Sequence, residues 1–169
     1  MRGKFYQFEA KYSNQVALIE HNEKFRYDEL AEVADNIGKH VYKRSTVLVV
    51  CSNSIASIAG YIGFLREKSV PLLMSTKNEY TLFSTLIEDY CPNYLFLPSS
   101  SPWLNIKTTV VHSYGGYTLH KTEYPSTTLH DELALLLATS GSTGSPKFVR
   151  LSYKNLERNA DSIVQYLGI

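Results

Sequence analysis

Cysteine, long apolar runs and net charge are all scarce in this chain of 169 residues. Its two cysteines, Cys51 and Cys91, are far apart, lie beside apolar runs and show no spacing typical of a metal site. We predict two buried free thiols in a reducing compartment, which indicates the cytoplasm. The longest apolar stretch, residues 55–65, is too short to span a bilayer. The net charge of +1 gives no basic footprint for a nucleic acid.

The composition nevertheless supports one substantial core. Hydrophobic residues make up 44% of the chain and charged residues 20%, which is ordinary for a globular domain. A chain of this length can bury one such core. The five histidines share no spacing with each other or with carboxylates, so we expect them to be structural or solvated. No residue is predicted to be a nucleophile, a general base or a metal ligand.

Helical and strand patterns alternate along the chain. Apolar residues at steps of three and four predict helices near residues 28–42, 54–67, 79–90 and 153–167. Continuous apolar runs predict buried strands near residues 46–51, 70–74, 93–97 and 133–139. Shorter patterns predict a hairpin over residues 16–27 and strands near residues 107–112 and 117–120. This alternation predicts an α/β fold with a mainly parallel sheet flanked by helices.

The most informative segment follows the apolar run of residues 133–138 and reads Thr139-Ser140-Gly141-Ser142-Thr143-Gly144-Ser145-Pro146-Lys147. Its glycines let the backbone approach a ligand closely, and successive N–H groups in such a turn bind anions. The hydroxyl groups add hydrogen-bond donors, and the ammonium of Lys147 adds a positive charge. We therefore predict a loop that holds the polyphosphate of a nucleotide. The loop is not a P-loop, in which the lysine directly follows a glycine and a helix begins. The sequence after Lys147 instead favours a strand, so we expect the loop to join two strands.

This segment resembles the phosphate loop of the AMP-forming adenylating enzymes. That superfamily includes acyl-CoA synthetases, the adenylation domains of nonribosomal peptide synthetases, and luciferase. Its signature reads Thr-Ser-Gly-Ser/Thr-Thr-Gly-x-Pro-Lys, and the chain matches it throughout. Looser likenesses lie at residues 25–30, 60–72 and 152–156, with Lys68-Ser69 where the family has Ala-Gly, and Phe148 where it has a small residue. The likeness runs from about Val16 to the last residue and covers the N-terminal third of such enzymes.

The resemblance implies that residues 1–169 are the N-terminal portion of an adenylation domain, part of its large N-terminal domain, without the rest of that domain or the C-terminal domain. It implies an ATP-dependent ligase that activates a carboxylic acid as an acyl-adenylate. The acyl group would pass to a thiol, of coenzyme A or of the phosphopantetheine of an acyl or peptidyl carrier protein. The residues that would bind the ATP phosphates are Thr139, Ser140, Gly141, Ser142, Thr143, Gly144 and Lys147. Mg²⁺ would be held by a residue outside this chain, and we expect the chain alone to be inactive.

Two other functions stay open on the sequence. The first is a nucleotide-binding module that performs no chemistry, such as a degenerate relative with a regulatory role. The second is an unrelated α/β interaction domain in which the loop is a coincidence. The resemblance implies that the acid pocket is built largely from residues after this segment.

Overall fold

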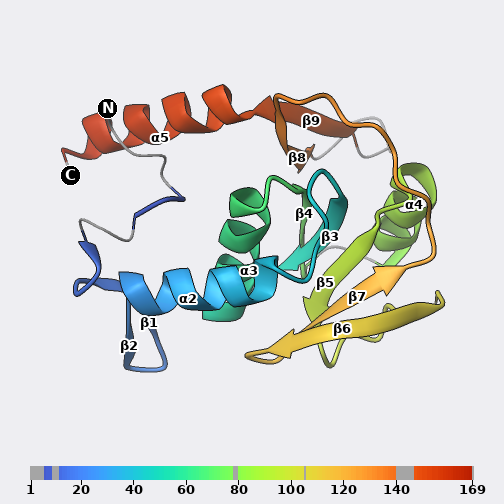
Figure 1. Cartoon of the computed structure of the whole chain (residues 1–169), viewed down its shortest axis with the longest axis horizontal. Coiled ribbons are helices and arrows are strands. Elements are labelled where there is room, and N and C mark those ends of the chain that lie inside the picture. The colour runs from blue at the N-terminus through green and yellow to red at the C-terminus, as the bar shows by residue number, and fades with distance from the viewer. Residues whose placement is uncertain (1–5, 9–11, 78–79, 105, 140–146, 169) are drawn as a thin grey trace.

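The computed structural model describes residues 6–8, 12–77, 80–104, 106–139 and 147–168. Helices and strands alternate as the sequence predicted (Figure 1). The helices are α2 (Tyr27–Gly38), α3 (Ile55–Arg66), α4 (Tyr80–Tyr90) and α5 (Tyr153–Leu167). The strands are β1 (Val16–Glu20), β2 (Glu23–Arg26), β3 (Thr46–Cys51), β4 (Val70–Ser75), β5 (Tyr94–Pro98), β6 (Thr108–Tyr114), β7 (Tyr117–Thr122), β8 (Leu133–Thr139) and β9 (Lys147–Ser152).

Seven of these strands form one sheet in the order β6-β7-β5-β3-β4-β8-β9. The central strands β5, β3, β4 and β8 are parallel to one another. At one edge of the sheet, β7 runs antiparallel to both of its neighbours, β5 and β6. At the other edge, β9 runs antiparallel to β8. The prediction of a parallel sheet is therefore confirmed for the centre, while both edges are antiparallel. β1 and β2 form the separate hairpin that was expected.

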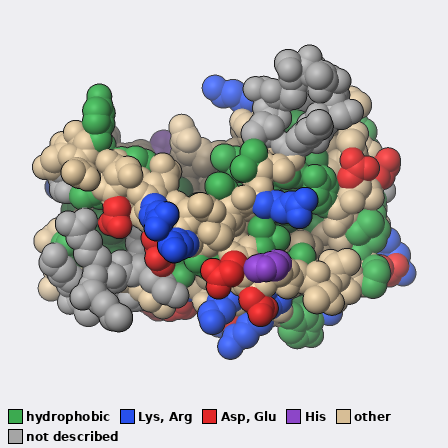
Figure 2. Space-filling model, turned by 90° about the horizontal axis from the view of Figure 1, so that it is seen from above, with side chains coloured by type: hydrophobic (Ala, Val, Ile, Leu, Met, Phe, Trp, Pro, Cys, Tyr) green, Lys and Arg blue, Asp and Glu red, His purple; other side chains and the backbone are tan. Residues whose placement is uncertain are grey.

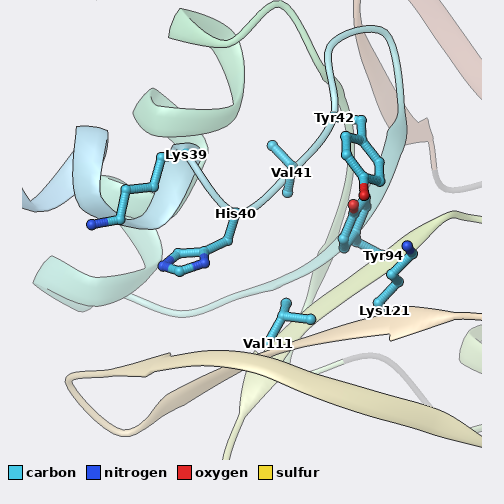
Figure 3. Close-up of a pocket in the computed structure, with 7 residues that line it drawn as sticks. All are labelled: Lys39, His40, Val41, Tyr42, Tyr94, Val111 and Lys121. Atoms are coloured by element: carbon cyan, nitrogen blue, oxygen red, sulfur yellow. The ribbon is translucent and has the colours of Figure 1, made fainter.

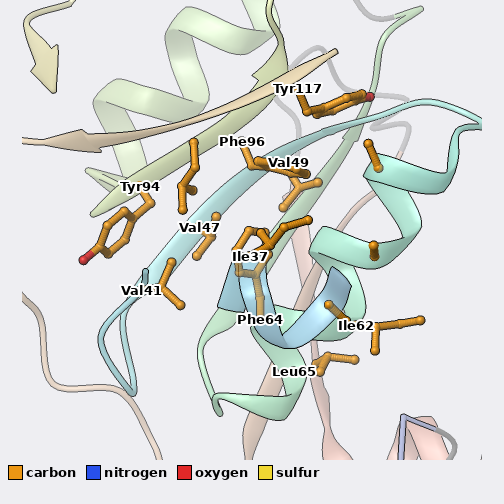
Figure 4. Packing of buried hydrophobic residues seen from close by; sticks show 14 of the residues in the cluster. Ile37, Val41, Val47, Val49, Ile62, Phe64, Leu65, Tyr94, Phe96 and Tyr117 are labelled. Carbon is orange, nitrogen blue, oxygen red and sulfur yellow. The ribbon is translucent and has the colours of Figure 1, made fainter. Parts of the chain in front are cut away.

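The central strands are continuous apolar runs because helices cover both faces of the sheet. On one face, α2 and α3 pack over β3 and β5, with Val47, Val49, Phe64 and Phe96 all fully buried (Figure 4). On the other face, α4 contributes Phe83 to a second cluster of buried apolar side chains. Each cluster joins helix and strand residues that are distant in sequence, which fixes the layers of the domain.

A glycine sets the spacing between α2 and α3. A Cβ atom at Gly63 would lie 2.2 Å from the backbone oxygen of Ala34, a separation that real Cβ atoms do not show. The two helices can therefore approach closely only without a side chain at this position. Arg66, at the end of α3, adds a paired contact to the Asp35 carboxylate of α2 at 2.6 and 2.9 Å.

α5 differs from the other helices because none of its residues is buried. The Ser152 hydroxyl accepts from the backbone N–H of Asn155, and Gly168 ends the helix in a left-handed conformation with φ +67°. Seen from above, the side on which α5 and β9 lie, hydrophobic side chains reach the surface among basic and acidic ones (Figure 2). Among the described helices, none is both long and apolar enough to cross a membrane.

Candidate phosphate-binding site

The predicted phosphate loop connects two paired strands. β8 and β9 form an antiparallel pair in which Thr139, the last residue of β8, lies opposite Lys147, the first residue of β9. The expectation that the loop joins two strands is thus confirmed. The intervening Ser140, Gly141, Ser142, Thr143 and Gly144 lie outside the described residues. Their contacts with phosphate stay a prediction, as do those of Thr139 and Lys147.

The loop is carried at the carboxyl edge of the parallel strands. β8 pairs with β4 in a register that sets Leu72 beside Leu136 and Leu73 beside Leu137. β4 in turn ends level with β3, where Cys51 pairs with Ser75. The strand ends of β3, β4 and β8 therefore meet at one edge. In open α/β sheets, ligands bind outside the carboxyl ends of the strands, so this edge is the candidate site.

A buried tyrosine orders the polar groups at this edge. Tyr117, on β7, donates its hydroxyl to the backbone oxygen of Val50 at 2.9 Å and approaches the Ser52 hydroxyl at 2.8 Å. Ser52 in turn lies 3.0 Å from the hydroxyl of Ser54, the residue that caps α3. No sequence pattern indicated this role for Tyr117, because it depends on β7 crossing back to pair with β5. The network fixes the segment between β3 and α3.

The N-terminus of α3, which also lies at this edge, already meets a carboxylate. Glu20, at the end of β1, accepts from the backbone N–H of Ile55 at 3.3 Å. A carboxylate is favourable there because the N–H groups of the first turn have no partners within the helix. This helix end is therefore occupied by the chain's own side chain, and the hairpin β8–β9 carries the candidate anion site.

Both cysteines are free thiols, as predicted, but neither is fully buried. Cys51 is the last residue of β3 and Cys91 follows α4 in a left-handed conformation with φ +42°, so each lies where an element ends at the surface of the core. The prediction of two buried thiols is therefore wrong, because both side chains are only half-buried. Partial burial raises the pKa of the Cys51 thiol to about 11, which keeps it protonated at neutral pH. Cys51 is therefore a poor nucleophile despite its position at the candidate edge.

The histidines do not assemble a metal site. In the described part of the chain, no three His, Cys, Asp or Glu side chains come together in a way that could hold a metal ion. His40 stacks on His112 with ring centroids 4.5 Å apart, and the Nδ1 of His120 lies 3.1 Å from the Thr108 hydroxyl. Burial lowers the pKa of His112, with further contributions from His40 and Lys39. These contacts agree with structural roles for the three histidines.

Comparison with known proteins gives consistent matches. The family described as AMP-binding enzyme matches residues 5–168. A plipastatin synthase polypeptide of Bacillus subtilis is 27% identical over 154 residues, which cover 86% of this chain and 4% of that protein. O-succinylbenzoate coenzyme A synthetase of Bacillus subtilis, solved in complex with AMP, superposes with a TM-score of 0.77 at 21% identity, over 96% of this chain and 45% of that one. The N-terminal subdomain of Klebsiella oxytoca NpsA, in complex with 3-hydroxybenzoyl-AMSN, superposes with a TM-score of 0.63 at 20% identity. The superposition covers 87% of this chain and 39% of that one.

The matches to solved structures establish the fold. The synthetase has also been solved with ATP and a magnesium ion, and in that form superposes with a TM-score of 0.76 at 21% identity, over 96% of this chain and 46% of that one. At such identities the likeness to solved structures shows the fold alone. The chain spans less than half the length of these proteins and a small fraction of the plipastatin synthase polypeptide. The resemblance to the N-terminal part of adenylating enzymes is thus confirmed.

Proposed function

Because the chain belongs to the AMP-binding enzyme family, we propose that it supplies the phosphate-binding part of an ATP-dependent ligase. The ligase activates a carboxylic acid as an acyl-adenylate and releases pyrophosphate. It then transfers the acyl group to a thiol, of coenzyme A or of a carrier-protein phosphopantetheine. The observation that carries this proposal is the pairing of Thr139 with Lys147 at the carboxyl edge of the parallel sheet.

The β8–β9 hairpin supports the proposal by its geometry. A hairpin that closes at Thr139 and Lys147 leaves only seven residues, 140–146, between the two strands. These seven carry both glycines and most of the hydroxyls of the family signature. A short glycine-containing connection presents its backbone N–H groups to an anion that arrives at the strand ends.

The chain's own part in the reaction is to hold the leaving group. As the acid attacks the α-phosphorus of ATP, negative charge grows on the departing pyrophosphate, and catalysis depends on positioning and neutralising it. Backbone N–H groups near Gly141 and Gly144, the neighbouring hydroxyls and the Lys147 ammonium perform this role. A residue outside residues 1–169 would hold Mg²⁺, which would supply further neutralisation of the phosphate charge.

The remaining elements of the ligase lie in other parts of the protein. We assign residues 1–169 to the N-terminal portion of the adenylation domain, and the exposed apolar residues towards the end of α5, such as Ile163 and Leu167, support this assignment. The acid pocket, the adenine site and the thiol acceptor then belong to the rest of the enzyme. The two free thiols favour a cytoplasmic location.

The loop assignment is tested by ATP–pyrophosphate exchange in a chain that continues from residue 169 into a complete adenylation domain. Gly141→Val abolishes exchange, because the added side chain blocks the close approach of phosphate to the backbone. Lys147→Ala slows exchange about thirtyfold, the effect of losing one charged contact of about 2 kcal/mol. Residues 1–169 alone give no exchange.

Lys154→Ala is the matched control, because it removes the same charge from an exposed position on α5. It leaves the exchange rate unchanged. Normal exchange in the Gly141→Val variant refutes the loop assignment and the ligase function with it. Phosphate binding without exchange in the complete domain, for every acid tried, indicates a nucleotide-binding module instead.

A further inference from the structure

A cavity of about 420 Å³ opens at the opposite end of the sheet from the predicted phosphate loop. It lies between the connection from α2 to β3 and the edge formed by β5, β7 and β6 (Figure 3). Its volume falls within the range of small-molecule sites. The residues that line it are Lys39, His40, Val41, Tyr42, Tyr94, Val111 and Lys121.

The charged groups of this cavity are all basic. Within the described part of the chain, no carboxylate forms an ion pair with Lys39 or Lys121, although other exposed basic groups such as Lys107 do find one. His112, whose pKa is lowered first by burial and then by His40 and Lys39, stacks against the cavity residue His40. The Lys121 ammonium, which lies on the cavity wall without an acidic partner, favours the binding of an anion.

The other walls of the cavity are aromatic and apolar. Lys121 holds its ammonium 4.9 Å above the ring of Tyr42, and the rings of Tyr42 and Tyr94 lie 6.5 Å apart. Tyr42 is 68% exposed, whereas Tyr94 and Val41 are buried and form the inner wall. Figure 3 shows the Tyr42 and Tyr94 side chains side by side, with Lys121 beside them. An aromatic wall next to a cation suits a ligand that combines a flat ring with a negative charge.

This cavity is separate from the candidate phosphate site. Tyr42 precedes β3, and Tyr94 is the first residue of β5. The cavity therefore lies at the amino ends of these parallel strands. The predicted phosphate loop follows the carboxyl end of β8, which runs in the same direction. Six residues of β3 at about 3.3 Å each put roughly 17 to 20 Å between the two ends of the sheet. A ligand here would not occupy the place of the ATP phosphates.

We propose that this cavity is a second binding site, which takes a small planar aromatic carboxylate. Lys121 meets the carboxylate, and the ring of the ligand packs against the Tyr42–Tyr94 wall and Val41. Lys39 and His40 line the other end of the cavity, and the Lys39 ammonium points away from Lys121 and the tyrosines (Figure 3). The site goes beyond the proposed ligase function, because none of its residues belongs to the phosphate loop or to the carboxyl edge of the sheet.

Nuclear magnetic resonance of the ¹⁵N-labelled chain tests the proposal, with benzoate as the probe. Saturable shifts are expected at the amides of Tyr42, Tyr94, Val111 and Lys121, with a dissociation constant in the millimolar range or below. Benzamide has the same ring without the charge, and inorganic phosphate has charge without a ring. Both are expected to bind at least tenfold more weakly, because each lacks one of the two interactions.

Lys121→Gln is expected to weaken benzoate binding about tenfold, the effect of losing one charged hydrogen bond. Lys121 is exposed, so this variant keeps the fold, which far-ultraviolet circular dichroism checks. Lys154→Gln removes the same charge from α5, which contributes no residue to the cavity lining, and leaves benzoate binding unchanged. The proposal is overturned if benzoate shifts no cavity amide, if phosphate binds as tightly as benzoate, or if the two lysine variants weaken binding equally.

Discussion

α3 and α5 are both capped by a serine, yet they relate to the rest of the molecule in opposite ways. α3 has 12 residues and buries eight of them between the sheet and α2. α5 has 15 residues and buries none. An isolated helix of this length is only marginally stable in water, so α5 depends on whatever packs against it. The difference separates a self-sufficient part of the domain, around β3 and α3, from a part whose packing is incomplete within this chain.

The incomplete part is also the part that carries the predicted phosphate loop. The apolar residues of α5 recur at helical spacing, and Ile163 and Leu167 among them are 48% and 58% exposed. On the neighbouring hairpin, Leu137 of β8 and Val149 of β9 are 42% and 44% exposed. The strands that frame the loop thus gain less from burial than the central strands do. We expect that covering this apolar surface stabilises the β8–β9 hairpin.

Shortening a leucine to alanine in each of the two helices is expected to give the largest difference in the free energy of unfolding. Leu65 of α3 is fully buried, so Leu65→Ala is expected to lower the free energy of unfolding by about 3 to 4 kcal/mol. Leu167 of α5 is 58% exposed, so Leu167→Ala is expected to lower it by less than about 0.5 kcal/mol. Urea denaturation followed by circular dichroism measures both. Equal losses would show that α5 is as well packed as α3 and would remove the distinction.

The buried side-chain amide of Asn93, in the self-sufficient part, is expected to give the next largest effect on the free energy of unfolding. The Asn93 side-chain oxygen accepts from the backbone N–H and the hydroxyl of Thr46, at 3.1 and 3.2 Å, and joins the starts of β3 and β5. Asn93→Ala leaves these buried donors without that acceptor, so the free energy of unfolding is expected to fall by about 2 kcal/mol. Asn53→Ala, at an exposed position beside α3, is the control and changes it by less than about 0.5 kcal/mol. Equal values for the two would show that the Asn93 contacts contribute nothing net.

The pattern of the sequence was sufficient for the central part of the fold. Strands such as β3 are continuous apolar runs, and helices such as α3 have a capping serine and a basic last turn, so both were placed to within one or two residues. The antiparallel edges were not predicted, because the direction of β7 depends on where the chain returns after β6. α2 ends at Gly38, before the predicted residue 42, because the backbone then turns, with the N–H of His40 bonded to the Ile37 oxygen and that of Val41 to the Gly38 oxygen.

For the candidate site, the sequence located the loop and the two strands that carry it. That was possible because the signature is contiguous, from Thr139 to Lys147, and follows an apolar run. Tyr117 and the basic cavity around Lys121 were not found, since each brings together segments that are far apart in sequence. Periodicity reports which face of an element is buried, but not which distant element lies against it.

The smallest expected effect compares the two capping serines. Ser54 accepts from the backbone N–H of Ser57 at 3.2 Å, and Ser152 accepts from that of Asn155 at the same distance. Either serine changed to alanine removes a cap that contributes about 1 kcal/mol to its helix. Because α3 is folded together with the core, Ser54→Ala is expected to lower the global free energy of unfolding by that amount. Ser152→Ala is expected to leave the global value unchanged and to raise the hydrogen-exchange rates of α5 amides about fivefold, since α5 can open without exposing buried residues. If Ser152→Ala instead lowers the global value as much as Ser54→Ala, α5 unfolds with the core, and the division of the molecule into two parts fails.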